Sequence, residues 1–118
     1  MIAFDTNYLL RHLLQDDMVQ SAHVDHLIQE QVEAGQSVLI LDLVIMETCW
    51  VLMKVYKMHK EAWCEILGSL LSDPVFEFEN TSRLRQALNL FENGKADFTD
   101  YMILANAQSH GATLETFD

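Results

Sequence analysis

The chain has 118 residues, of which 50% are hydrophobic and 21% are charged, with 4 glycines and 1 proline. This length and composition suit one globular domain and exclude a disordered or fibrous protein; no apolar run is long enough to cross a membrane. The formal net charge of -11 argues against a metal-free RNA-binding surface, because nucleic-acid binders usually present basic residues to phosphate. Clustered acids would instead form a cation site, at which bound ions reverse the local charge.

The first third of the chain alternates between short apolar runs and helical patterns. Residues 2–4 form an apolar run of strand type that stops at Asp5, and residues 5–7 are suited to capping the helix that follows through residue 14. A second helical pattern covers residues 18–34, and residues 38–41 are typical of a buried strand. The first residues lack a basic-then-apolar targeting signal, so we expect a cytoplasmic protein.

The same alternation continues through the rest of the chain. In chain order we predict a helix, a helix, a strand, a helix, a helix and a final strand at residues 42–56, 59–71, 75–78, 81–91, 97–110 and 113–117. Strands separated by helices of this length need crossover connections. We therefore predict an α/β fold with three α/β/α layers, in which helices flank a mostly parallel sheet of about four strands.

Acidic residues follow the predicted strands. Ligands of an open parallel sheet collect beyond the carboxyl ends of its strands, and the acids at or soon after those ends are Asp5, Glu47, Asp97, Asp100 and Asp118. Hard oxygen ligands that converge from several elements suit Mg²⁺ or Mn²⁺. Two such ions can stabilise the attacking and leaving oxygens of an in-line displacement.

Each acid also has a structural interpretation. Helix capping alone would explain Asp5. Asp97 and Asp100 can complement a helix dipole, and Asp118 can belong to a turn. Glu47 is harder to explain in this way, because its helical stripe is otherwise apolar and an unpaired carboxylate there would be costly. We therefore expect a ligand or partner for Glu47.

Four runs of the sequence, in this order and spacing, resemble successive motifs of the PIN-domain family and of its VapC-like toxins. They are IAFDTNYLLRHLLQDD, LDLVIMETCWVL, GKADFTDYMILANAQSHGA and TLETFD. The resemblance covers residues 1–118 as one PIN-like domain. It implies a small α/β/α fold, endoribonuclease activity that needs Mg²⁺ or Mn²⁺, and neutralisation by a partner antitoxin. Relatives usually continue beyond the last aspartate with a basic residue, so we expect this chain to lack a short C-terminal extension.

Carried over residue by residue, the resemblance assigns roles to seven positions. The family's catalytic, metal-binding acidic quartet corresponds to Asp5, Glu47, Asp100 and Asp118. Asp97 matches an additional metal-binding acid. Thr6 and Asn7 match positions at which a hydroxyl or amide orients Asp5 or a water at the metal. Hydrolysis by in-line attack of water would leave a 5'-phosphate and a 3'-hydroxyl.

Three arginines are candidates for contacts to RNA phosphates, with plain surface solvation as the alternative: Arg11, Arg83 and Arg85. The two cysteines, Cys49 and Cys64, fall in separate helical patterns without a CxxC motif, so we expect buried thiols.

The toxin interpretation includes a homodimer and an antitoxin whose Arg or Lys side chains reach the carboxylates. Two alternatives stay open. One is a PIN-fold nuclease that processes RNA without a toxic role. The other is a non-catalytic acidic module that only binds a basic partner. A haloacid-dehalogenase-like phosphatase also begins with a strand and an aspartate, but Asn7 stands where its second aspartate is expected.

Overall fold

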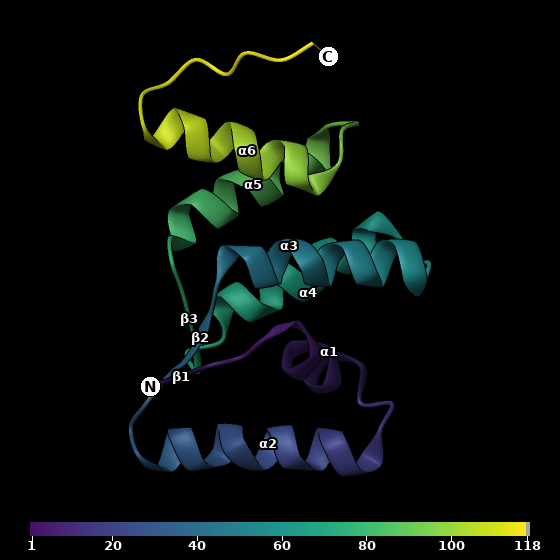
Figure 1. Ribbon diagram of the computed structural model, residues 1–118, viewed down its shortest axis with the longest axis vertical. Helices are drawn as coiled ribbons and strands as arrows, with labels where there is room; N and C mark the ends of the chain where they lie inside the picture. Colours follow the sequence, from purple (N-terminus) through teal and green to yellow (C-terminus); the bar gives the residue numbers. More distant parts are fainter. Residues whose placement is uncertain (118) are drawn as a thin grey trace.

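A computed structural model describes residues 1–117 of the chain. Within that range the strands pair in parallel in the order β1-β2-β3 and cover Ile2–Ala3, Val38–Ile40 and Phe76–Phe78. The helices α1 to α6 cover Thr6–Leu14, Met18–Glu33, Asp42–Trp50, Lys60–Ser72, Thr81–Asn93 and Phe98–Ser109, and a π-helical turn, η1, covers Val51–Val55. The predicted α/β class with a parallel sheet flanked by helices is confirmed (Figure 1).

One face of the sheet carries the core. Val38 pairs in register with Ile2 on one side and with Phe76 on the other, and the Val38 side chain is fully buried. Phe4 and His12 meet the Phe76 ring at centroid distances of 6.5 and 5.5 Å, which places α1 over this face. Val38 is therefore buried, as expected for the strand predicted at residues 38–41.

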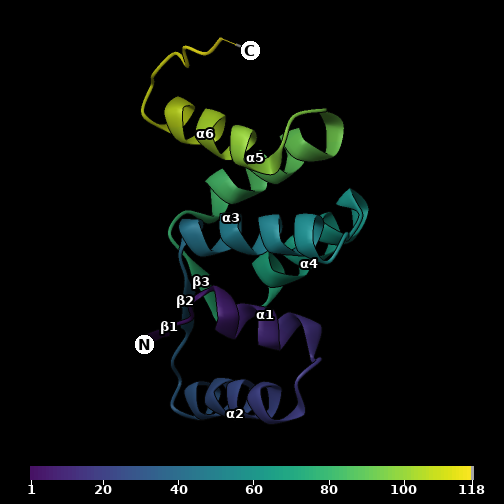
Figure 2. The same ribbon diagram turned by 45° about the vertical axis from the view of Figure 1, so that its right-hand side comes forward.

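The opposite face of the sheet is less covered. Ala3, Leu39 and Glu77 pair in register across the three strands, so their side chains point to this second face. Ala3 and Glu77 are exposed and Leu39 is half-buried. Helices α5 and α6 lie beyond α3 and α4, at the end of the molecule far from β1 (Figures 1 and 2).

Side-chain caps explain where several of the helices begin. Asp5 caps α1 as predicted, because its carboxylate accepts a hydrogen bond from the Tyr8 amide at 2.9 Å. The cap of α5 is Asn80, whose side chain accepts a hydrogen bond from the Arg83 amide at 2.9 Å. The pattern over residues 42–56 is a single helical run, but its last turn widens into η1.

The predicted strand at residues 113–117 is wrong for this structure. Residues 112–117, which we call the tail, form neither helix nor strand. Gly111 ends the preceding turn at φ 69°, and the chain then runs back beside α6 (Figure 1). A strand needs a neighbouring strand to satisfy its backbone, and this tail lies far from the sheet. The described sheet therefore has three strands and not about four. No helix within residues 1–117 has both the length and the apolar character required to cross a membrane.

Candidate functional site

Two of the predicted acids line the same cavity at the carboxyl end of β1. Asp5 follows β1 directly, and Glu47 comes from the middle of α3, which packs beside α1. Both line a cavity of about 470 Å³ together with Thr6, Asn7 and Arg11. We call this the Asp5 cavity. Its position at the end of a parallel strand is the one at which open α/β sheets bind ligands.

Hydrogen bonds fix both carboxylates. The amide of Tyr8 donates to Oδ1 of Asp5, which holds this side chain at the positive end of the α1 dipole. The hydroxyl of Thr6 donates to Oε1 of Glu47 at 2.9 Å, across 41 positions of sequence. Each carboxylate keeps a second oxygen that can face a ligand.

Glu47 has the expected partner but not the expected surroundings. Its side chain is exposed, and the neighbours on its helical face are Leu43 and Trp50, which are 69% and 59% exposed. Val44, three residues before Glu47, is buried on the core side. The interaction of Glu47 with Thr6 therefore stabilises an orientation at the surface and does not neutralise a buried charge.

The other described acids lie in a second cavity, of about 280 Å³, at the start of α6. Asp97 and Asp100 line it with Trp50 and Lys54, and we call it the Asp100 cavity. The Asp97 amide donates to Oδ2 of Asp100 at 3.2 Å, so this carboxylate also helps to begin the helix. Lys54 supplies a cation that the sequence interpretation did not include, since it falls within an ordinary helical pattern.

The described part of the chain therefore divides the predicted acids between two cavities. Within residues 1–117 no three His, Cys, Asp or Glu side chains are grouped so that they could hold a metal ion. Asp118 lies outside the described residues. The donors of the Asp5 cavity nevertheless suit Mg²⁺ chemically, because they are carboxylate, hydroxyl and amide oxygens. Magnesium usually takes one or two carboxylates and completes its shell with water and substrate phosphate.

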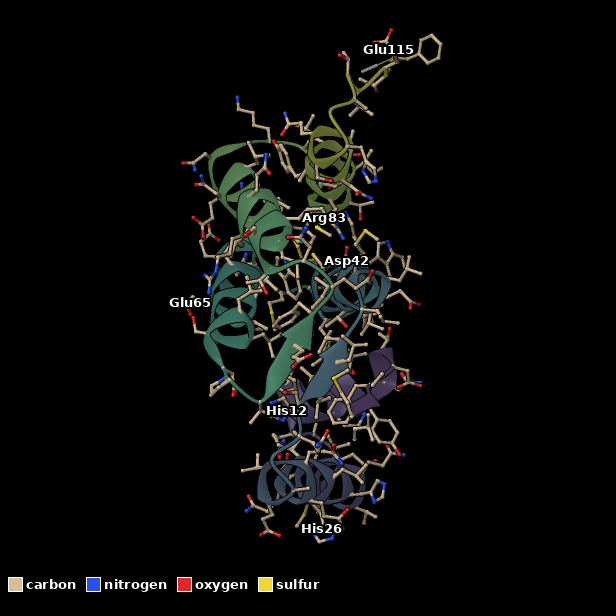
Figure 3. The ribbon with its side chains drawn as sticks, turned by 90° about the vertical axis from the view of Figure 1, so that its left-hand side faces the viewer. His12, His26, Asp42, Glu65, Arg83 and Glu115 are labelled. Carbon is tan, nitrogen blue, oxygen red and sulfur yellow. The ribbon has the colours of Figure 1, made fainter. Side chains whose placement is uncertain are left out.

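The three candidate arginines all have partners within the protein. Arg11 pairs with Asp16 at 2.6 Å and still lines the Asp5 cavity. Arg83 pairs with Asp42, and Figure 3 shows the two labelled side chains meeting between α5 and the start of α3. The Arg85 guanidinium donates to a backbone carbonyl, that of Leu71, at 3.3 Å. Arg11 is thus the candidate closest to the acids.

A larger cavity, of about 640 Å³, adjoins the Asp5 cavity and shares Asn7 and Arg11 with it. Tyr8 and His23 line it, with the tyrosine oxygen 3.3 Å from Nε2 of His23 and their ring centroids 6.0 Å apart. Only the packing of α1 on α2 brings His23 to Tyr8, so no local pattern indicated this pair.

The cysteines do not form a thiolate centre. Burial, with smaller contributions from Cys64 and Asp97, raises the pKa of Cys49 to about 12. Burial also raises the pKa of Cys64, which is only half-buried. The expectation of a buried thiol is confirmed for Cys49, whereas Cys64 is more exposed than we expected.

The fold and the Asp5 cavity together define an α/β protein with an acidic site at the carboxyl edge of a parallel sheet. Comparison with known proteins gives the family. The PIN domain model matches residues 2–118, and the chain belongs to the PIN domain family. It is also similar to a VapC ribonuclease of Aquifex aeolicus (strain VF5), with 25% identity over 112 residues that cover 94% of this chain and 82% of that protein.

Proposed function

We propose that the protein is a Mg²⁺- or Mn²⁺-dependent endoribonuclease and that it acts in the cytoplasm as the toxin of a toxin-antitoxin pair. The observation that carries this proposal is that Asp5 and Glu47 line one cavity at the carboxyl end of β1, where the Thr6 hydroxyl donates a hydrogen bond to Glu47 at 2.9 Å. Membership of the PIN domain family and the similarity to a VapC ribonuclease support it.

In this proposal Asp5 and Glu47 hold the divalent ion, and Asp97, Asp100 and Asp118 complete the acidic set. The ion, when bound, would offset the negative charge that develops on the oxygens of the cleaved phosphodiester. Thr6 keeps Glu47 in one orientation, and the Tyr8 amide does the same for Asp5. Asn7 lies where its amide can orient a water molecule, since it lines the same cavity.

The cleavage would be an in-line attack of water on phosphorus, with a 5'-phosphate and a 3'-hydroxyl as products. A carboxylate oxygen of Asp5 or Glu47 that is free of the hydrogen bonds described above can accept a proton from the attacking water. The RNA chain can continue past Asn7 and Arg11 into the larger cavity. There Tyr8 and His23 offer ring surfaces for an unstacked base.

The charge of the chain suits a basic partner. With a net charge of -11, the surface attracts cationic segments over a Debye length and increases their rate of association. An antitoxin segment with Arg or Lys would form charge-assisted hydrogen bonds to the same carboxylates that hold the metal. Such a segment would compete with the ion and block RNA cleavage.

The test uses two aspartates that have the same structural task. Asp5 and Asp17 each cap a helix and each accept a backbone amide three residues later at 2.9 Å. Asparagine caps a helix as well as aspartate does, so Asp5→Asn and Asp17→Asn both keep the cap and remove one charge. We expect Asp5→Asn to lose at least about 100-fold in Mg²⁺-dependent RNA cleavage and Asp17→Asn to retain it, with unchanged circular dichroism for both.

Equal activity of the two variants would contradict the assigned role of Asp5. Titration calorimetry with Mn²⁺ separates a nuclease from a non-catalytic acidic module, for which we expect no site-like binding. Growth arrest on expression, relieved by the product of a neighbouring gene, distinguishes a toxin from an RNA-processing nuclease. Normal growth would contradict the toxin role and leave the cleavage chemistry intact.

A further inference from the structure

Lysines are concentrated in one segment of an otherwise acidic chain. Residues 48–60 contain Lys54, Lys57 and Lys60 and no aspartate or glutamate, although the whole chain has 18 acidic residues. Two of the three arginines are already paired with aspartates, whereas no lysine within residues 1–117 forms an ion pair with a carboxylate. Lys54 and Lys57 are both exposed. The segment therefore presents cations that the protein itself does not neutralise.

The backbone of this segment departs from an ordinary helix. The amide of Tyr56 donates to the Val51 carbonyl, five residues earlier, at 3.1 Å, which widens the η1 turn. Lys57 then ends the turn in the left-handed region at φ 56°, where glycine is the usual residue because a Cβ is strained there. Widened turns and strained residues are common at functional sites. This geometry therefore points to a role beyond the connection of α3 to α4.

The same segment lines both acidic cavities. Val51, Val55 and Tyr56 line the Asp5 cavity, and Trp50 and Lys54 line the Asp100 cavity. The end of η1 also lies on the same side of the molecule as the loop between α5 and α6, which leads to the acids of the second cavity (Figures 1 and 2). A ligand that extends from one cavity to the other would therefore contact this segment.

Two large aromatic side chains of the segment are exposed. Trp50 is 59% exposed and Tyr56 is 44% exposed, and each lines a different one of the two cavities. Exposed apolar side chains of this size mark a contact surface. Lys54 lies four residues after Trp50, so the ring and the ammonium group share one face of the helical run. Such a pair suits single-stranded nucleic acid, whose bases stack on the ring while its phosphates attract the cation.

We propose that residues 50–57, which we call the η1 platform, bind an unpaired segment of the RNA substrate. Trp50 and Tyr56 stack bases, and Lys54 and Lys57 contact phosphates. The identity of the nucleic acid rests on the proposed nuclease function, but the contacts are tested by binding, without cleavage. Unpaired RNA is the substrate class that fits, because the bases of a duplex already stack on one another and offer no free face to a ring.

Charge favours RNA over a protein partner at this surface. A protein attracted by the net charge of -11 is basic, and the lysines of the η1 platform would repel it. RNA is attracted by the same lysines and also uses the two exposed rings. The acids that line the neighbouring cavities are the ones assigned to the divalent ion, which offsets their repulsion of phosphate when it is bound.

Tryptophan fluorescence tests the stacking contact directly. The chain has two tryptophans, and Trp63 is fully buried, so a change in emission on addition of RNA reports on Trp50. In the Asp5→Asn variant, which leaves the RNA uncut, we expect a single-stranded oligonucleotide to quench this emission and a duplex of the same sequence to leave it unchanged. Unchanged emission at saturating single-stranded RNA, or equal quenching by the duplex, would overturn the stacking role.

The salt dependence of binding tests the phosphate contacts. For a single strand, each phosphate contact contributes about 0.7 to the slope of log K against log salt. We expect Lys54→Gln and Lys57→Gln, in the Asp5→Asn background, each to reduce the slope by about that amount for every RNA sequence. Arg85→Gln removes the same charge from α5, where the guanidinium donates to the Leu71 carbonyl, and should keep the slope. Wild-type slopes for both lysine variants would overturn the proposal.

Ring variants distinguish RNA from a protein partner. Trp50→Leu should weaken RNA binding roughly 5-fold or more, whereas Trp50→Phe should retain most of it because a stacking ring remains. Circular dichroism confirms that both variants fold. If Trp50→Leu lowers the mass found by light scattering but keeps the RNA affinity, Trp50 contacts another protein chain and the proposal is overturned. A wild-type chain that binds RNA through the η1 platform without cleaving it would contradict the nuclease function alone.

Discussion

The ion pair of Asp42 and Arg83 joins the start of α3 to α5. Its removal tests whether Arg83 stabilises the fold or contacts RNA phosphate. Each side chain is only 14% exposed. Oδ1 of Asp42 and Nε of Arg83 are buried without a hydrogen-bond partner among the described residues. The change Arg83→Leu would leave the Asp42 carboxylate in this pocket with no counter-charge.

The magnitude follows from this burial. Removing one partner of a fully buried pair costs about 3 to 5 kcal/mol, whereas an exposed pair contributes about 0 to 1 kcal/mol. For the mostly buried Asp42 and Arg83 we expect a loss of about 3 kcal/mol in the free energy of unfolding. With an unfolding entropy of about 2.1 cal/mol/K per residue, this corresponds to a decrease in Tm of roughly 12 °C.

Urea unfolding followed by circular dichroism measures the loss of stability. Comparison with a variant that lacks both charges shows whether the loss comes from the unpaired Asp42 carboxylate. The double variant Asp42→Leu/Arg83→Leu replaces both charges by apolar groups and should lie within about 1 kcal/mol of wild type. Arg85→Leu, at an exposed arginine of the same helix, should cost less than about 1 kcal/mol. If Arg83→Leu keeps the wild-type stability but weakens RNA binding, the arginine contacts phosphate and our reasoning is refuted.

Two further predictions follow from the cavity and the thiol. Thr6→Val removes the donor to Glu47 and should lower cleavage by about 10-fold or more, while Thr6→Ser retains it; equal rates would remove Thr6 from the site. Because the pKa of Cys49 rises from 9.0 to about 12, its thiol ionises first in the unfolded chain, and the free energy of unfolding should fall by up to about 1.4 kcal/mol per pH unit across that interval. Cys49→Ala should flatten this decline in alkaline urea titrations, and an unchanged slope would contradict the assignment.

Local signals predicted most elements of the fold. Apolar periodicity and the cap at Asp5 depend only on residues that are close in the sequence. They located β1, α1 and the other helices to within a few positions. The tail shows what such local signals cannot predict. Its alternation satisfies the pattern of a strand, but a strand also requires a neighbour, and the location of that neighbour is a property of the whole fold.

The site was predictable in a similar, partial way. The order of strands and acids placed Asp5 at the sheet edge, and the family motifs indicated Glu47. The bond between Thr6 and Glu47 and the pair of Arg83 with Asp42 each span 41 positions, so no local pattern could have shown them. For Arg83 the sequence could only offer phosphate or solvent as partners, because its actual partner depends on how α5 packs against α3.

Electrostatics gives a reason for the separation of the acids in one chain. Two carboxylates about 4 Å apart repel by about 4 kcal/mol at an effective dielectric constant of 20, and the grouping of Asp5 and Glu47 with Asp97 and Asp100 adds several such pairs. A divalent ion reverses the sign of these interactions. In the proposed nuclease the ion would therefore remove the repulsion that keeps these carboxylates apart.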